Sequence, residues 1–216
     1  GKIQQVKKVI ISFPMQKIVL GGDHLGPNVW YSIQQDVAME NAKNQIDAYT
    51  KAGFHKIHLD ASMPLKGDTL PLDPRISAER AAVLCSISEN TNTKNSDKKP
   101  LYVIGTEVPT PGGAQEQLND LQPTSVADVN ETIEITRRAF RERGLDEAWQ
   151  RVIAVVVQPG VEFSDDSVVN YSSPRAKALS AFIEEIPQIV YEAHSTDYQS
   201  ESALTKMVED HFAILK

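Results

Sequence analysis

Polar residues able to do acid–base or metal chemistry stand at the ends of several short apolar runs in this sequence. They are Asp23, His24, Asp60, Ser62, Glu107, Gln158, Glu192, His194, Ser195, Thr196 and Asp197. Carboxylates and imidazoles transfer protons and bind divalent cations, and hydroxyls can hold a phosphate group. Their recurrence after apolar runs predicts one site that is assembled from distant parts of the chain.

The stretch Gly21–Pro27 carries Asp23 and His24 directly after the first apolar run. Its glycines would let a substrate approach the backbone, and the Asp–His pair offers a proton donor beside an imidazole metal ligand. An alternative stays open here, because such an aspartate can cap a helix and such a histidine can bond a backbone carbonyl. Asp60 and Ser62 repeat the pattern at the next run, with the same alternative.

Three residues, His24, Glu107 and His194, have the ligand types of a catalytic zinc site, two imidazoles and one carboxylate. We therefore expect a divalent metal, zinc or manganese, if the fold brings these distant positions together. The other three histidines are interpreted as structural, because they lie in or beside the apolar runs. They are His55, His58 and His211.

The elements that must position these residues alternate along the chain. Apolar runs rich in Val, Ile and Leu predict strands covered on both faces at Lys17–Gly22, Lys56–Ala61, Leu101–Val108, Val152–Gln158, Ile189–Ala193 and Phe212–Leu215. Amphipathic patterns predict helices at 31–52, 76–90, 125–143, 173–185 and 199–209. Ser125 and Asp128 are expected caps, and Gly53 and Gly144 expected stops. This alternation indicates parallel strands with right-handed crossovers.

Two α/β architectures fit this alternation, a doubly wound open sheet and a (β/α)₈ TIM barrel. The first run is not followed by G-x-G-x-x-G, and polar residues end nearly every run, as in a barrel whose strand ends converge on one face. The barrel is therefore preferred, with about six of its eight βα units present. We expect residues 1–216 to form one barrel domain, an excerpt of a longer chain that begins in a helix at Gly1–Phe13. Thr91–Lys99 is expected to be a surface loop.

Composition limits the partners and the compartment. The formal net charge of −7 argues against a nucleic-acid partner, and no run of about 18 apolar residues predicts a membrane span. Cys85 is the single cysteine, stands in a helical pattern, and is expected to be buried and unreactive. These features indicate a cytoplasmic protein.

Several segments resemble the GatZ/KbaZ family, the Z subunits of D-tagatose-1,6-bisphosphate aldolase. They are Gly21–Asn28, Lys56–Met63, Ala78–Cys85, Val103–Pro109, Val156–Phe163 and Tyr191–Gln199. The likeness runs from about Lys17 to Lys216, and members of the family are roughly twice this length. The family is in turn related to class II ketose-bisphosphate aldolases, which are zinc enzymes on a TIM barrel.

The resemblance implies roles for individual residues. Asp23 matches the class II proton donor and His24 a zinc ligand, while Glu107 matches a glutamate that ends a later strand. Gln158 stands where the class has a histidine ligand, and His194 matches the last ligand only approximately. The catalytic residues are thus expected to be Asp23, Asp60 and Glu192, the metal ligands His24, Glu107 and His194, and the substrate-binding residues Gly22, Asn28, Ser62, Gln158, Ser195, Thr196 and Asp197.

Two functions remain open from the sequence. The chain resembles a subunit that supports the activity and stability of a separate catalytic aldolase Y subunit acting on a phosphorylated ketose. The alternative is a metal-dependent ketose or uronate C4-epimerase that works by retro-aldol chemistry. A kinase is not expected, because the sequence contains no G-x-x-x-x-G-K-[ST] phosphate loop.

Overall fold

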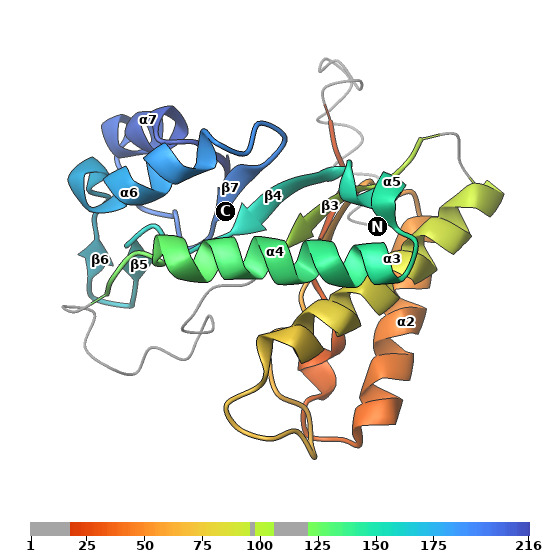
Figure 1. Ribbon diagram of the computed structural model, residues 1–216. Coiled ribbons are helices and arrows are strands. Elements are labelled where there is room, and N and C mark those ends of the chain that lie inside the picture. The colour runs from red at the N-terminus through yellow and green to blue at the C-terminus, as the bar shows by residue number, and fades with distance from the viewer. Residues whose placement is uncertain (1–17, 96–97, 106–120) are drawn as a thin grey trace, which may run out of the picture.

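The protein is described by a computed structural model that covers residues 18–95, 98–105 and 121–216. Its centre is a six-stranded sheet with the order β1-β2-β3-β4-β7-β8, in which every neighbouring pair is parallel. The strands are β1 (Gly21–Leu25), β2 (Lys56–Leu59), β3 (Leu101–Ile104), β4 (Val152–Val156), β7 (Val190–Ala193) and β8 (Phe212–Leu215). The expected parallel strands in sequential order are confirmed, and the sheet is curled like part of a barrel (Figure 1).

Helices follow the strands and cover the outer face of the sheet. The long ones are α2 (Gln35–Lys51), α3 (Pro74–Asn95), α4 (Val126–Glu142), α6 (Ser173–Ile183) and α7 (Glu201–Glu209), and the short ones are η3 (Pro27–Trp30) and α5 (Asp146–Trp149). α3 packs between α2 and α4, and α4 runs across the sheet (Figure 1). Among the described residues, none of these helices is long and apolar enough to cross a membrane.

The strands alternate between the two faces of the sheet, as the two-residue period of a strand requires. Ile57, Tyr102 and Tyr191 are fully buried in the main core against the helices. Val103, Ala154 and Val156 form a smaller cluster on the opposite, concave face. Each large side chain in the main core contributes about 1.5–3 kcal/mol by leaving water. Cys85 lies in this core as expected, and burial raises the pKa of its thiol, so it is not a reactive thiolate.

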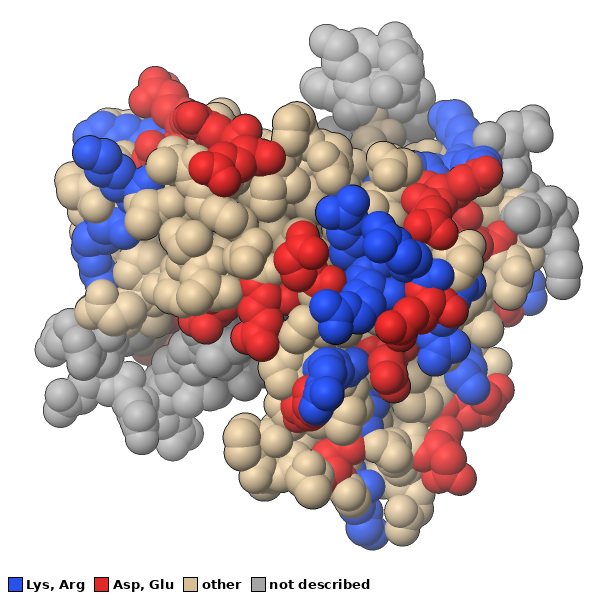
Figure 2. Space-filling view, in the orientation of Figure 1, with Lys and Arg blue, Asp and Glu red and all other residues tan. Residues whose placement is uncertain are grey.

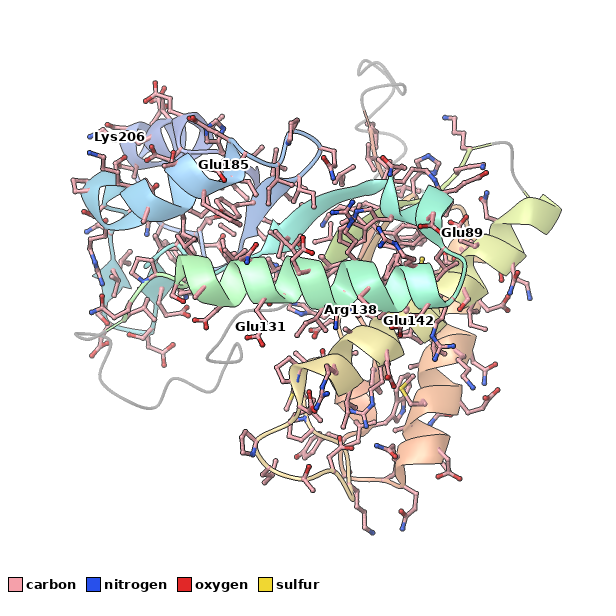
Figure 3. The ribbon with its side chains drawn as sticks, viewed as in Figure 1. Glu89, Glu131, Arg138, Glu142, Glu185 and Lys206 are labelled. Atoms are coloured by element: carbon pink, nitrogen blue, oxygen red, sulfur yellow. The ribbon has the colours of Figure 1, made fainter. Side chains whose placement is uncertain are left out.

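In helix α4 the apolar residues that recur at helical spacing form the face that is buried. Val129, Ile133 and Phe140 recur at helical spacing and are buried. The charged residues Glu131, Arg138 and Glu142 point away from the sheet (Figure 3). On this side of the molecule acidic and basic side chains lie interspersed (Figure 2). The helix begins as expected, since the Ser125 hydroxyl accepts the Asp128 backbone N–H at 3.1 Å.

Some expected boundaries were wrong. The first strand begins at Gly21, not Lys17, and carries Asp23 and His24 within it. Thr91–Asn95 belongs to α3 and is not a loop. A two-stranded antiparallel sheet, β5 (Glu162–Phe163) with β6 (Val168–Val169), was not expected. Gly53 and Gly144 do follow α2 and α4, with φ of 83° and 68°. The expected helix at Gly1–Phe13 lies outside the described residues.

A buried ion pair anchors the long loop between β2 and α3. Asp68 accepts two hydrogen bonds from Arg80 of α3, at 2.8 and 2.9 Å. It also accepts the backbone N–H of Leu65 at 2.6 Å and the side-chain amide of Gln35 at 2.5 Å. Both charged side chains are buried, at 3% exposure for Asp68 and 7% for Arg80. The loop that follows Asp60 therefore has a fixed attachment to α2 and α3.

Replacing Arg80 by alanine should lower the free energy of unfolding by about 3–5 kcal/mol at neutral pH, because a buried carboxylate would lose its partner. The Arg80 hydrogen bonds hold the pKa of Asp68 below its usual value. The stabilisation that ionised Asp68 gives the folded protein is therefore complete above the pKa of about 3.9 that an aspartate has in the unfolded chain. It is lost as the pH falls through the lower pKa of Asp68 in the folded protein. Urea denaturation at several pH values would measure both effects. Arg75→Ala, at the exposed pair with Asp73, should change little.

Candidate active site

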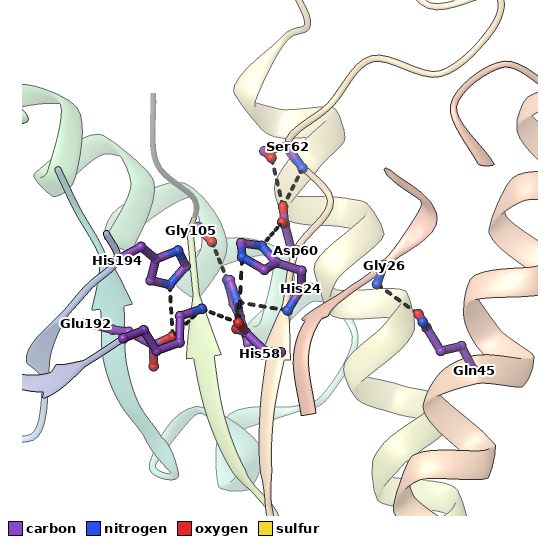
Figure 4. Close-up of polar contacts among 11 residues, drawn as sticks. His24, Gly26, Gln45, His58, Asp60, Ser62, Gly105, Glu192 and His194 are labelled. Carbon is purple, nitrogen blue, oxygen red and sulfur yellow. Dashed lines mark hydrogen bonds and ion pairs between the residues drawn. The ribbon is translucent and has the colours of Figure 1, made fainter. Parts of the chain in front are cut away.

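The concave face of the sheet carries a cluster of titratable side chains at the carboxyl ends of its strands (Figure 4). Asp23 on β1, His58 on β2, and Glu192 and His194 at the end of β7 have one ligand atom each within 4.8 Å of all the others. We call these residues the four-residue cluster. Four ligands about 2.0–2.2 Å from one ion lie no more than about 4.4 Å apart. The cluster could therefore hold a divalent cation after shifts of tenths of an ångström.

His58 shows most clearly why a cation fits. Its Nε2 lies 2.8 Å from the carbonyl oxygen of Gly105, which only accepts, so Nε2 carries a proton. Its Nδ1 accepts the backbone N–H of His24 at 3.3 Å and also lies 3.0 Å from Oδ1 of Asp23, so a cation between Nδ1 and the carboxylate would make that second contact favourable. A second proton or a metal ion would satisfy it. A carbonyl that fixes the far nitrogen of the ring is also the usual support of a metal-bound histidine.

The structure places His58, which the sequence led us to interpret as structural, in the four-residue cluster. Its side chain is fully buried and faces the cluster, while Ile57 and Leu59 beside it pack against the helices. The two-residue alternation in Lys56-Ile57-His58-Leu59 is the signal that could have shown this. His55 and His211 lie elsewhere, and His211 pairs with Glu184 at the surface.

His24 and Asp60 form an oriented pair next to the cluster (Figure 4). The Nδ1 of His24 lies 2.9 Å from Oδ2 of Asp60, whose other oxygen accepts the Ser62 hydroxyl at 2.8 Å. The hydrogen bond with Asp60 raises the pKa of His24 although partial burial opposes it. Burial opposes ionisation of Asp60, but bonds from His24, Ser62 and Asn28 lower its pKa to about 2. Asp60 thus remains an anion that holds a proton on His24.

Two lysines balance the acidic members of the cluster. Lys56 Nζ lies 2.6 Å from Oε2 of Glu192, and Lys216 Nζ lies 3.5 Å from Oε1 of the same carboxylate. Lys216 also pairs directly with Oδ2 of Asp23. Sequence reasoning identified neither lysine as a site residue. The alternation that faces His58 inward also faces Lys56 inward, whereas nothing local in the sequence marks Lys216.

These contacts set the charges of the cluster. Burial raises the pKa of Glu192, but His194 and Lys56 outweigh it and lower the value to about 2. Asp23 behaves alike: burial opposes ionisation, yet bonds from His58 and Lys216 hold its pKa far below the usual range. Burial lowers the pKa of His194 despite its 3.1 Å contact with Glu192. Anionic carboxylates and a neutral imidazole are the forms that bind a metal.

The expectation that the polar residues share one rim of the sheet can be checked at four positions: Asp60 and Gln158 follow β2 and β4, Glu192 lies near the end of β7, and Asp23 lies within β1. Glu107, the expected carboxylate ligand, lies outside the described residues. Of the other two expected ligands, His194 belongs to the four-residue cluster, and His24 stands beside it with ring centres 4.9 Å apart.

The expected substrate-binding residues fall into two groups. Asn28 and Ser62 lie beside the site, where both bond Asp60. The others have different surroundings: a Cβ on Gly22 would meet Leu25 and Tyr49 on the helix side, and Gln158 accepts the backbone N–H of Gly160 and Val161.

The loop after His194 is held to the end of β8. Thr196 donates its backbone N–H and its hydroxyl to the carbonyl of Lys216, both at 2.7 Å. Ser195 has a positive φ of 55°, and Asp197 is exposed. The arrangement fixes the backbone that follows His194 and leaves Asp197 facing solvent.

Comparison with known proteins identifies a family and relatives that this chain resembles. A family model described as D-tagatose-1,6-bisphosphate aldolase subunit GatZ/KbaZ-like matches residues 3–216. Proteins named D-tagatose-1,6-bisphosphate aldolase subunit GatZ from Salmonella gallinarum and Klebsiella pneumoniae are each 52% identical over 206 residues, which is 95% of this chain. The match covers 48% of each relative, so the chain spans about half their length.

A solved structure has the same fold. The crystal structure of a probable tagatose 6 phosphate kinase from Sinorhizobium meliloti 1021 superimposes with a TM-score of 0.84 at 42% sequence identity. The superposition covers 99% of this chain and 51% of that one.

Proposed function

The chain belongs to the D-tagatose-1,6-bisphosphate aldolase subunit GatZ/KbaZ-like family, and on that basis we propose that it forms the site-bearing part of an aldolase subunit acting on a phosphorylated ketose. The observation that carries this proposal is the convergence of Asp23, His58, Glu192 and His194 next to the oriented His24–Asp60 pair. A cation site beside an acid–base group is one arrangement that can support reversible cleavage of a ketose.

We further propose that the six strands belong to a complete eight-stranded barrel in the whole protein. The sequential parallel order supports this, as does the contact between Lys216, after β8, and Asp23 on β1. That contact means that the sheet curls far enough for the ends of its first and last strands to approach each other. A closed barrel would also cover the open outer edges of these two strands.

Each group in the site has a distinct task. A divalent ion held by the four-residue cluster would polarise the ketose carbonyl and offset the charge that develops there when the C3–C4 bond breaks. His24 would take the proton of the C4 hydroxyl on Nε2 and return it in the reverse direction. Asp60 keeps the ring in one orientation through Nδ1 and stabilises the charged imidazolium, the role of the third group in a catalytic triad.

The relatives are named as subunits, so we propose a second, catalytic aldolase subunit as partner. The alternative function, C4-epimerisation of a ketose or uronate, uses the same cleavage followed by addition to the other face of the aldehyde. The intact His24–Asp60 pair favours retaining this alternative, because a purely supporting subunit has no need of an oriented proton carrier. The name of the Sinorhizobium protein suggests a kinase, but the sequence of the present chain contains no G-x-x-x-x-G-K-[ST] phosphate loop.

One assay separates these functions. The full-length protein would be incubated with D-tagatose 1,6-bisphosphate alone and with the catalytic subunit, and triose phosphate and C4-epimerised ketose would be measured. Stimulation that appears only with the partner supports the subunit function. An epimer formed without the partner supports the alternative. No effect on either product, in the presence of zinc or manganese, would contradict both.

Replacing His24 by asparagine should reduce the activity found in that assay by about 10²-fold or more, because a positioned general acid–base contributes 10²–10⁴-fold. The matched control is His211→Asn: its ring also pairs with a carboxylate, Glu184, and both histidine side chains are 38% exposed. That variant should keep full activity. Equal activity of the two variants would show that His24 carries no proton in the reaction.

A further inference from the structure

Two lysines pair with the carboxylates that would hold a metal ion in the four-residue cluster. Lys216 contacts Asp23 and Glu192, and Lys56 contacts the second oxygen of Glu192. These two carboxylates supply the only anionic groups of the cluster. An ion bound there would place two positive charges close to ammonium groups that pair with the same two carboxylates.

The charges in the described site are already close to balance without a metal. Asp23, Asp60 and Glu192 are three carboxylates that each pair with a basic side chain. Lys56 pairs with Glu192 and Lys216 pairs with Asp23, so two of the carboxylates are neutralised. The third, Asp60, pairs with His24. A divalent ion therefore enters only if a resident cation leaves or an anionic ligand arrives with it.

The side chains of Lys56 and Lys216 differ in how easily they can move away from the carboxylates of the four-residue cluster. Lys56 is 15% exposed and lies deep on the concave face, against a carboxylate with no exposure. Lys216 is 26% exposed and reaches Asp23, which is 37% exposed. Its backbone is held separately, because its carbonyl accepts two hydrogen bonds from Thr196. The side chain of Lys216 can therefore swing toward solvent while the backbone stays in place.

Building on the metal site of the proposed function, we propose that Lys216 is an internal cation that competes with the divalent metal for Asp23 and Glu192. With the metal absent, the ammonium holds the two carboxylates near each other. With the metal bound, Lys216 is displaced from Asp23 and becomes available to an anionic group of the substrate at the mouth of the site. Lys56 stays paired with Glu192 and keeps the total charge low.

Competition of this kind predicts that removing the ammonium tightens metal binding. In the full-length protein, Lys216→Met should bind Mn²⁺ at least about tenfold more tightly than the parent in calorimetric titration. Lys216→Arg, which keeps the charge, should stay close to the parent. Lys51→Met is the matched control, because Lys51 also pairs with an aspartate at 2.6 Å, Asp47, but on the surface of α2. It should leave the affinity unchanged.

A second measurement follows the lysine itself. Acetylation of Lys216 by acetic anhydride, counted by mass spectrometry, should become faster when Mn²⁺ is added, while acetylation of Lys51 stays constant. Tight binding to Lys216→Met with weak or no binding to the parent supports the proposal. Equal affinity of the two proteins overturns it and leaves the metal site standing. Failure of both proteins to bind overturns the competition and the metal site together.

Discussion

Replacing His58 by alanine should reduce the affinity for Mn²⁺ or Zn²⁺ by more than about 100-fold and remove any activity that depends on the metal. Loss of a group that only supports a ligand typically costs 10–100-fold, and His58 is expected to be a ligand itself. Its two ring nitrogens contact Asp23 and the Gly105 carbonyl, so alanine removes one partner from each of them. Metal content after dialysis, measured by mass spectrometry, would give the result.

His58→Ala needs a control for folding, because the side chain is fully buried. Circular dichroism of each variant would establish that the sheet has formed. His55→Ala, three residues earlier and outside the cluster, should bind metal like the parent. If folded His58→Ala kept the metal content of the parent, the cation site would have to be built from other residues.

Replacing Gly26 by alanine should cost about 3 kcal/mol or more of folding free energy, at the upper end for an overpacked site. A Cβ at this position would lie 1.6 Å from the carbonyl oxygen of Asp60. The contact is with backbone, so no side chain can turn away to relieve it. The residue that must move is Asp60, and we also expect the His24–Asp60 pair to be disturbed. Thermal and urea denaturation would measure the loss.

Gly21→Ala is the matched control on the same segment. Its Cβ would meet the side chain of Lys56 at 3.5 Å and the Lys56 carbonyl oxygen at 3.8 Å, which are both ordinary contacts. The change in stability should stay within about 1 kcal/mol, the usual range for a tolerated substitution. A similar loss for both variants would show that the close approach at Gly26 is not what limits this position.

The order and direction of the strands could be predicted because they depend on strong, repeated signals. Apolar runs such as Val152–Val156 and caps such as Ser125 act locally, and the structure uses them as expected. The start of the first strand could not be predicted, since Ile18–Leu20 is as apolar as the segments that do form strands. The Leu20 carbonyl already accepts the backbone N–H groups of His55 and Lys56, but the strand register with β2 begins at Gly21, opposite Lys56. Helix α3 continues through Thr91 because that hydroxyl bonds Asp47 of α2, a tertiary contact that no local pattern displays.

The site was predictable in its location but not in its membership. Polar residues at strand ends pointed to the edge of the sheet where the four-residue cluster lies, and His194 and Asp23 belong to that cluster. His58 was missed because it stands inside an apolar run, where the chemistry of a residue depends on which face it occupies. Lys216 was missed because its partner, Asp23, is 193 positions away. Only the curl of the sheet brings those two together.

That separation has a consequence for how the protein is made. A ribosome adds about 5–20 residues per second, so Lys216 emerges about 10–40 s after Asp23. During this interval Asp23, His24 and His58 of the site exist without the ammonium group of Lys216. Contacts of such high sequence separation form late, after local helix and strand pairing. Nascent chains stalled before β8 should therefore lack the Lys216 ammonium beside Asp23, and synthesis of β8 and Lys216 would supply it.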